Sequence, residues 1–303
     1  MRPRSHPGSP RPRAGADLLT RRQWIATALA TGAGLGVADA FGVEPIRVTV
    51  TRHHVGPPGA PTVRVVQLTD LHLRGVGFHE QRIAQAVAEQ RPDLLLLTGD
   101  SIDRRDRLPQ LSEFLAMLPA GGERLAILGN WEHWGNVDLR ALRGTYERHG
   151  IRLLRNESVA LRFAAGPLLV TGLDDLVGGR PDVRGALAQA PPSPNHLLLA
   201  HCPAHREAFV ATAHASSSPA GVMLDPSLLR PRLMLSGHTH GGQLRFAGWA
   251  PFLPQGSGRY VSGWYRGDGP DLYVSRGLGT SVVPARVGAP PEIAVFDWAV
   301  AAS

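Results

Sequence analysis

Short apolar runs alternate with amphipathic segments along most of this chain, and this pattern limits the folds that it can adopt. Residues 63–69 and 94–98 have the composition of buried strands, and residues 80–90 between them have the pattern of a helix. Alternating strands and helices predict an α/β fold in which helices cover the sheets. The chain has more apolar runs than one sheet comfortably holds. We therefore expect two mixed β-sheets packed as a sandwich and flanked by helices.

The other expected elements follow the same alternation. Further strands are expected at residues 46–55, 125–128, 151–154, 159–163, 168–172, 196–200, 232–235, 271–275 and 292–298. Further helices are expected at residues 108–118, 138–149, 182–190 and 203–213, with Asp138 as an N-cap and Pro203 in a first turn. Loops are expected at 214–221 and at 247–270, where Trp249, Phe252, Tyr260, Trp264 and Tyr265 lie among Gly and Pro.

Residues 1–40 differ in composition from the rest of the chain. They carry six arginines and two acidic residues, a net charge of +4 out of +7 for the whole chain. Arg21-Arg22 precedes an uncharged run of about 14 residues, which is shorter than the roughly 20 needed to span a bilayer. The run closes with Ala38-Asp39-Ala40, which has the small-x-small pattern of a cleavage site.

The twin arginine and the run after it resemble the signal of the twin-arginine export route. We therefore expect a signal peptide at residues 1–40 and a single domain at residues 41–303, exported to the periplasm or to the outer face of the cytoplasmic membrane. An uncleaved membrane anchor is the alternative. Cys202 is the only cysteine, so no intrachain disulfide can form. The chain has no basic stripe with interleaved aromatic residues, so no nucleic-acid partner is expected.

Potential metal ligands follow five of the apolar runs. They are Asp70 and His72, then Asp100, Asn130 and His201, then His238 and His240 in a glycine-rich loop. Right-handed crossovers place the carboxyl ends of parallel strands at one edge of a sheet, so these side chains should meet. Asp70 and His72 should point the same way if their segment is extended, because side chains alternate there. Asp100 has two oxygens with which it can bridge two ions.

Oxygen and imidazole ligands suit a pair of transition-metal ions, and paired ions suit phosphoester hydrolysis. The glycine-flanked pair of His238 and His240 is the strongest element, because two unpaired histidines in such a loop have no packing role. Our hypothesis is in-line hydrolysis by a metal-bridging hydroxide. Arg276 and Arg286 are two further side chains for the phosphate to contact, and surface arginine is the alternative interpretation of both.

These motifs resemble those of the calcineurin-like metallophosphoesterase superfamily. The family patterns D-x-H, G-D-x-x-D, G-N-H-[DE], a lone H and G-H-x-H appear here as Asp70-Leu71-His72, Gly99–Asp103, Gly129–Glu132, His201 and Gly237–His240. The resemblance runs over residues 63–298. Residues 275–280 and 290–293 are similar to the bacterial exported or membrane-associated phosphodiesterases.

The resemblance implies a four-layer sandwich fold and a dinuclear site loaded with manganese, iron or zinc. It implies that one ion is bound by Asp70, His72, Asp100 and His240, and the other by Asp100, Asn130, His201 and His238. Trp131 stands where many members have a histidine that protonates the leaving group, and an indole cannot supply that proton. His133 is the expected substitute, and Asp103 would normally orient the missing histidine. A structural role beside Arg104 is the alternative for Asp103.

Export and the aromatic loop favour a periplasmic or lipid-linked phosphodiester as the substrate and a membrane surface as a partner. Aromatic residues suit membrane interfaces, and loop packing is the alternative interpretation of them. The resembled subgroup includes hydrolases of UDP-2,3-diacylglucosamine, which is made in the cytoplasm and fits export less well. Two other interpretations stay open: a metal-bearing binding protein that lost turnover with Trp131, and a cytoplasmic nucleotide phosphodiesterase.

Overall fold

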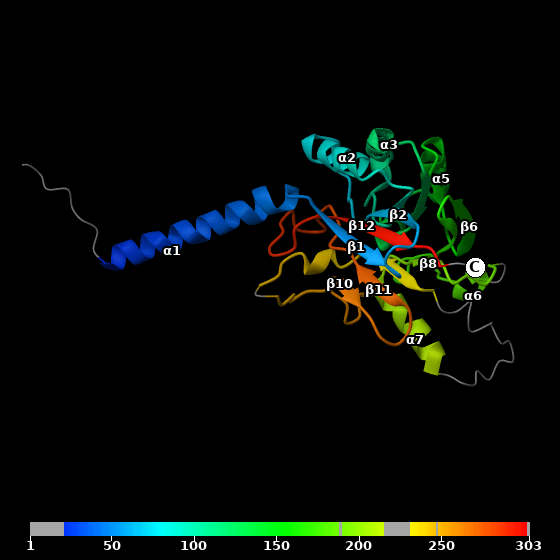
Figure 1. Ribbon diagram of the computed structural model, residues 1–303. Coiled ribbons are helices and arrows are strands. Elements are labelled where there is room, and N and C mark those ends of the chain that lie inside the picture. The colour runs from blue at the N-terminus through cyan, green and yellow to red at the C-terminus, as the bar shows by residue number, and fades with distance from the viewer. Residues whose placement is uncertain (1–20, 188–189, 215–230, 247, 302–303) are drawn as a thin grey trace, which may run out of the picture. The chain divides into compact units, whose positions relative to one another are not determined.

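The structure is a computed structural model that describes residues 21–187, 190–214, 231–246 and 248–301 (Figure 1). The chain divides into two compact units, Met1–Ala38 and Asp39–Ser303. The described part of the first unit is helix α1 (Arg21–Ala38). Among the described residues, no helix combines the length and the apolar character that crossing a membrane requires.

The second unit contains two six-stranded mixed sheets. The first has the order β1 (Thr49–Val55), β12 (Glu292–Ala299), β2 (Thr62–Leu68), β3 (Leu94–Thr98), β4 (Glu123–Ile127), β5 (Arg152–Leu153). The second has the order β10 (Gly263–Tyr265), β11 (Asp271–Val274), β9 (Leu233–Ser236), β8 (His196–Leu199), β7 (Gly166–Gly172), β6 (Glu157–Phe163). Strands β2 to β5 run parallel, as do β7, β8, β9 and β11.

The two sheets pack face to face, as the sequence predicts. One apolar cluster joins Leu94 and Leu96 of β3 to Leu197 and Leu199 of β8, and all four side chains are fully buried. Strand β3 has all five of its residues buried, because one face meets the second sheet and the other face meets helices. This arrangement explains its unbroken run of leucines.

Helices cover the outer faces of both sheets. The longer helices are α2 (Phe78–Gln90), α3 (Leu108–Met117), α5 (Leu139–Arg148) and α7 (Arg206–His214). The shorter ones are η1 (Asp39–Val43), η2 (Glu44–Ile46), η3 (Arg105–Arg107), α4 (Asn130–Trp134), α6 (Val183–Leu187), η4 (Pro203–His205) and η5 (His240–Gly242). Helices α2, α3 and α5 share a core with the first sheet through Ile83, Phe114 and Leu142. Asp138 caps α5 as expected, since its carboxylate accepts from the N–H groups of Arg140 and Ala141.

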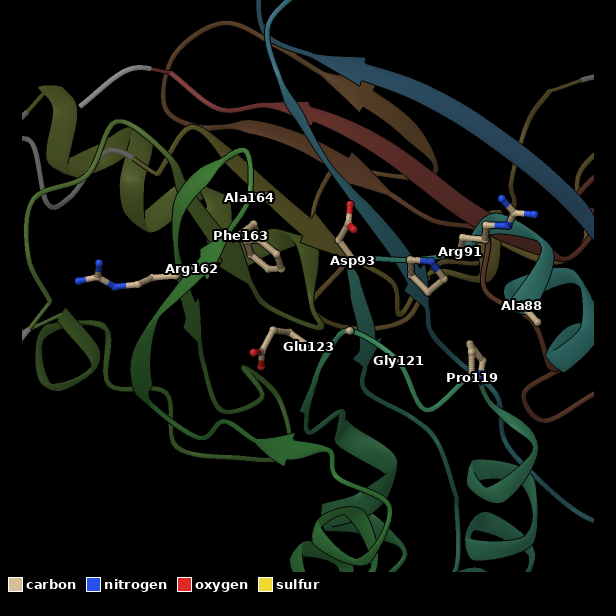
Figure 2. Close-up of a pocket in the computed structure, with 11 residues that line it drawn as sticks. Ala88, Arg91, Asp93, Pro119, Gly121, Glu123, Arg162, Phe163 and Ala164 are labelled. Carbon is tan, nitrogen blue, oxygen red and sulfur yellow. The ribbon is translucent and has the colours of Figure 1, made fainter.

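The parallel strands of both sheets place their carboxyl ends at one edge of the sandwich. A cross-sheet hydrogen bond joins the sheets there, since the Gln67 amide of β2 donates to the Ser236 carbonyl of β9 at 3.1 Å. The same amide donates to the Thr98 hydroxyl of the neighbouring strand β3 at 2.8 Å. The opposite edge carries an open hollow of about 710 Å³ (Figure 2). Phe163 and Ala164 at the end of β6 line one side of it, and Arg91 and Asp93 line the other.

The structure corrects one expectation in the long loop segments. The segment expected to be a loop at 247–270 contains strand β10, which pairs antiparallel with β11. Its alternation is only three residues long, which is too short for periodicity to show. Most of the loop expected at 214–221 lies outside the described residues.

Acid should destabilise this fold through His196. The ring is buried with its Nε2 atom 2.8 Å from the Thr171 hydroxyl, and burial lowers the pKa of His196 to about 4. The unfolded chain therefore binds the proton more tightly, so this contribution to stability is lost as pH falls below about 6.5. We expect the stability difference between the natural protein and His196→Gln to shrink by about 2 kcal/mol from pH 7 to pH 5.

Urea unfolding of both proteins at the two pH values measures this difference, and groups that titrate in both proteins cancel. A difference that does not change with pH would show that His196 is not held neutral.

Candidate metal centre

Five strand ends deliver the seven predicted ligand side chains to one edge of the sandwich. Asp70 and His72 follow β2, Asp100 follows β3, Asn130 begins α4 after β4, His201 follows β8, and His238 and His240 follow β9. Strands from both sheets contribute. All seven residues are buried, with exposed fractions of 4% or less.

The backbone of this edge is strained. Asp70, His72, Asp100, His238 and His240 all adopt positive φ angles, between 44° and 73°. This region is unfavourable for residues with a Cβ atom, and it persists where the surroundings impose it, often at functional sites. The loop after β2 is therefore not extended, which corrects our expectation of an extended segment. Asp70 and His72 still converge, but they do so through two left-handed residues and not through strand alternation.

The first group of potential ligands consists of Asp70, His72 and His240. Their donor atoms all lie within 4.8 Å of one another. The Nε2 atoms of the two histidines are 3.1 Å apart, and Nε2 of His240 is 3.5 Å from Oδ1 of Asp70. Burial is the main reason why the pKa of Asp70 rises to about 6. Positive charge at this position would therefore stabilise the carboxylate.

The second group consists of Asp100, His201 and His238, again with donor atoms within 4.8 Å of one another. Asn130 joins it, because its Oδ1 atom lies 2.9 Å from Nδ1 of His238. Oδ2 of Asp100 lies 3.2 Å from Nε2 of His201 and 3.6 Å from Nε2 of His72. One carboxylate oxygen thus faces both groups, which is the geometry of a bridging ligand.

Hydrogen bonds to backbone carbonyls orient the histidine rings of the second group toward its interior. His201 Nδ1 lies 2.8 Å from the Thr98 carbonyl, and His238 Nε2 lies 2.7 Å from the Gln255 carbonyl. A carbonyl only accepts, so each ring carries its proton on that nitrogen and turns the lone pair of the other nitrogen inward when it is neutral. Those lone pairs face oxygen atoms of Asp100 and Asn130. Cations between them would convert repulsion into coordination, and carbonyl-bonded histidines are typical of metal sites.

Glu132 supports this arrangement, and the sequence did not assign it a role. Its buried carboxylate accepts from the backbone N–H groups of Gly129 at 2.8 Å, Asp100 at 3.1 Å and Ser101 at 2.7 Å. The loops after β3 and β4 are therefore held to one side chain. Burial, followed by the charge of Asp100, raises the pKa of Glu132 to about 7. The sequence did contain a signal for Glu132, which is its position two residues after the predicted ligand Asn130.

The residues expected to handle protons lie outside both groups. The Trp131 ring stands edge-on to His72 of the first group, with 5.9 Å between the ring centroids. His133 lies one turn after Asn130, and its Nε2 atom is 2.8 Å from Oδ1 of Asp174. Asp174 is buried and also accepts from Arg155 at 2.9 Å. The hydrogen bond to Asp174 is the main cause that raises the pKa of His133.

Asp103 lies close enough to His72 for its charge to raise the pKa of that ring, against the larger effect of burial. Its Oδ1 atom is buried and has no hydrogen-bond partner among the described residues. The alternative role for Asp103 beside Arg104 gains no ion pair here, because Arg104 pairs with Asp106 at 2.9 Å. Asp106, two residues after Arg104, carries the same charge as Asp103, and the sequence alone does not show which of the two carboxylates pairs with Arg104.

Arg276 and Arg286 are neither phosphate ligands in this geometry nor simple surface residues. Arg286 is fully buried, and its guanidinium donates to the carbonyls of Gly279, Arg276 and Ala289. Arg276 donates to the Pro290 carbonyl and lies 3.6 Å from the carboxylate of Glu292. Both arginines hold the loop after β11 against β12.

A double α/β sandwich with two adjacent Asp/His groups at its strand ends defines a class of metal-dependent phosphoester hydrolases. The family described as calcineurin-like phosphoesterase matches residues 63–242, and this chain belongs to it. The protein is a metallophosphoesterase, an enzyme that hydrolyses phosphoester bonds, with two buried candidate metal sites.

Several characterised and uncharacterised proteins are similar to this chain. The metallophosphoesterase YkuE of Bacillus subtilis is 31% identical, over 92% of this chain and 97% of its own. The phosphodiesterase YaeI of Escherichia coli is 29% identical, over 92% of this chain and 99% of its own. Among solved structures, a phosphopantetheinyl hydrolase from Mycobacterium tuberculosis aligns over 78% of this chain and 98% of its own, with 13% identity and a TM-score of 0.43.

Proposed function

We propose that this metallophosphoesterase hydrolyses phosphodiesters. The observation that carries the proposal is the position of Asp100 Oδ2 between the two Asp/His groups, because it defines two adjacent cation positions. Asp70, His72 and His240 would hold one cation, and Asn130, His201 and His238 would hold the other. Two such cations supply charge neutralisation for the phosphoryl oxygens and lower the pKa of water. The similarity to the E. coli phosphodiesterase supports the diester as the substrate class.

The protein residues have separate tasks in this proposal. The carbonyls of Thr98 and Gln255 fix the rings of His201 and His238, so that each presents one nitrogen inward. Glu132 holds the loops that carry Asp100 and Asn130. Trp131 excludes water from one side of His72. Asp103 adds negative charge beside His72 and offsets part of the positive charge there.

Turnover of bis-p-nitrophenyl phosphate and of p-nitrophenyl phosphate, with manganese, iron or zinc supplied separately, tests the proposal. We expect the diester to give the higher kcat/KM. A clear preference for the monoester would contradict the diester assignment, and no turnover of either compound with any of the three metals would contradict hydrolysis at this site.

We propose His133 as the proton donor to the leaving group, with Asp174 as its positioning residue. The motivating observation is a half-buried imidazole one helical turn from Asn130, whose pKa is raised by its hydrogen bond to the buried carboxylate of Asp174. His133→Gln should lower kcat on an alkyl diester by about 10²-fold, the usual scale of general acid catalysis, and should barely change kcat on bis-p-nitrophenyl phosphate.

The pH dependence provides a second readout for His133. The raised pKa keeps the ring protonated above its ordinary range, so activity on the alkyl ester should fall as pH rises through that pKa. Asp174→Asn should move this alkaline limb to lower pH, and His133→Gln should abolish it. An unchanged limb in both variants would assign the proton to another group.

We propose further that the protein is exported by the twin-arginine route, with residues 1–40 as the signal. Arg21 and Arg22 lie at the start of helix α1, directly before the uncharged run. A reporter that requires export, fused after residue 45, should lose its signal when Arg21 and Arg22 are both replaced by Lys. Export that continues unchanged would exclude this route.

A further inference from the structure

An apolar surface adjoins the metal centre, and the proposed reaction does not use it. We call it the apolar shelf and define it by eight exposed side chains: Phe41, Val43, Ile46, Phe246, Trp249, Phe252, Val282 and Val283. Trp249 is 68% exposed, Phe252 80% and Val282 83%. Of the two interpretations of the aromatic loop, packing therefore holds for buried Tyr260 and not for Trp249 or Phe252. An exposed apolar patch of this kind usually marks an interaction surface.

Backbone hydrogen bonds join the segments that carry the shelf residues. The N–H of Arg286 donates to the Ala40 carbonyl at 2.9 Å, and the N–H of Arg245 donates to the Val287 carbonyl at 2.7 Å. Phe246 and Trp249 exchange two backbone hydrogen bonds. The Gln243 amide also donates to the Val283 carbonyl. In Figure 1 the yellow loop after β9 and the red loop after β11 lie on the same side of the sandwich.

The shelf connects directly to the proposed metal ligands. The loop that carries Trp249 and Phe252 begins after His240 and returns to the centre at Gln255, whose carbonyl binds the ring of His238 at 2.7 Å. The shelf therefore lies at the same edge of the sandwich as the Asp/His groups. A surface bound to the shelf would be presented to the metal centre.

The position of the shelf in the chain indicates what covers it. The second unit begins at Asp39, so the chain enters it through the shelf residues Phe41 and Val43, directly after an uncharged helical run rich in Ala and Gly. A bilayer is the surface that accepts both an uncharged leading helix and exposed Trp and Phe side chains, since aromatic residues are stable at the membrane interface.

We propose that the apolar shelf inserts into the surface of a lipid bilayer and that the metal centre acts on phosphodiesters carried by lipids. The first part of this proposal, the docking half, is insertion into the bilayer, and it depends only on the shelf. The second part, the substrate half, is the lipid-borne substrate, and it rests on the proposed function. Insertion by apolar side chains should persist at high salt, whereas attraction of arginine to anionic headgroups would be screened.

Fluorophore quenching in the full-length chain tests the docking half. Cys202 is the only cysteine and is buried, so Phe252→Cys and Ala164→Cys each add a single accessible thiol. Ala164 lines the hollow at the opposite edge (Figure 2) and is the matched control. With phosphatidylcholine–phosphatidylglycerol vesicles that contain brominated acyl chains, we expect quenching at position 252, in 0.5 M salt as well, and none at position 164.

Absence of quenching at 252, or equal quenching at both positions, would overturn the docking. A second copy of the chain is the competing occupant. If the label at 252 is shielded without vesicles and Trp249→Ser with Phe252→Ser converts a dimer to a monomer, self-association replaces membrane docking.

A lipid-anchored chromogenic diester tests the substrate half. Hexadecyl p-nitrophenyl phosphate in vesicles should have a kcat/KM at least about tenfold above that of soluble bis-p-nitrophenyl phosphate, because the shelf brings the centre to the interface. Trp249→Ser with Phe252→Ser should remove this advantage and leave turnover of the soluble diester within about twofold. Trp249→Phe with Phe252→Leu should retain the advantage.

No advantage for the vesicle-borne diester in the natural protein would overturn the lipid substrate class. Failure on both diesters, with quenching at 252 intact, would instead refute the proposed hydrolysis and leave the docking supported.

Discussion

Replacement of Asp100 by Asn should reduce phosphodiester turnover by roughly 10³-fold or more, the scale seen when one charge-stabilising group is removed from an active site. Oδ2 of Asp100 faces His201 at 3.2 Å and His72 at 3.6 Å, so both cation positions depend on its charge. Asn has the same shape, and the hydrogen bond that Oδ1 accepts from the Trp131 N–H at 2.9 Å can be kept. The fold should survive while metal binding is lost.

The readouts are turnover of bis-p-nitrophenyl phosphate and metal content after dialysis. Asp106→Asn is the control, because Asp106 is an exposed carboxylate that pairs with Arg104 away from the centre. A variant at position 100 that retains both metals and full turnover would show that this carboxylate does not bridge two ions.

Replacement of Glu132 by Ala should have the largest effect on stability, about 3–5 kcal/mol. The change leaves the N–H groups of Gly129, Asp100 and Ser101 buried without an acceptor, and each unsatisfied buried group costs about 1–3 kcal/mol. The loops that carry Asp100 and Asn130 would also relax, so metal affinity should fall by about 10–100-fold. Urea unfolding and metal titration measure the two effects.

Glu132→Gln should be milder, because its amide oxygen can still accept one or two of these bonds. Glu113→Ala on the exposed face of α3 is the control and should change stability by less than about 0.5 kcal/mol. A Glu132→Ala protein that unfolds at the natural urea midpoint would mean that backbone rearrangement or water replaces the carboxylate.

The layered architecture could be predicted because apolar periodicity directly records burial on one or two faces. The leucine run of β3 indicates a strand covered on both sides, and the structure confirms the two packed sheets. Short elements could not be predicted in this way. Strand β10 and helix α4 are three and five residues long, and their placement depends on tertiary pairing and on Glu132.

The convergence of the candidate ligands could be predicted from topology alone, since every one of them follows a strand. The route by which they converge could not. Positive φ angles at Asp70 and His72 reflect constraints from loops distant in the sequence. For example, the Asp70 N–H donates to the Gly99 carbonyl at 3.1 Å. Buried partners such as Asp174 for His133 also join segments about forty residues apart, and no local pattern encodes them.

The most direct test of the account is anomalous diffraction from crystals of the protein loaded with manganese or zinc. The account predicts two peaks on either side of Asp100 Oδ2, roughly 3.5–4 Å apart as in other two-metal hydrolases. One peak would lie beside Asp70, His72 and His240, and the other beside Asn130, His201 and His238. A single peak, or peaks away from Asp100 at saturating metal, would contradict the dinuclear centre.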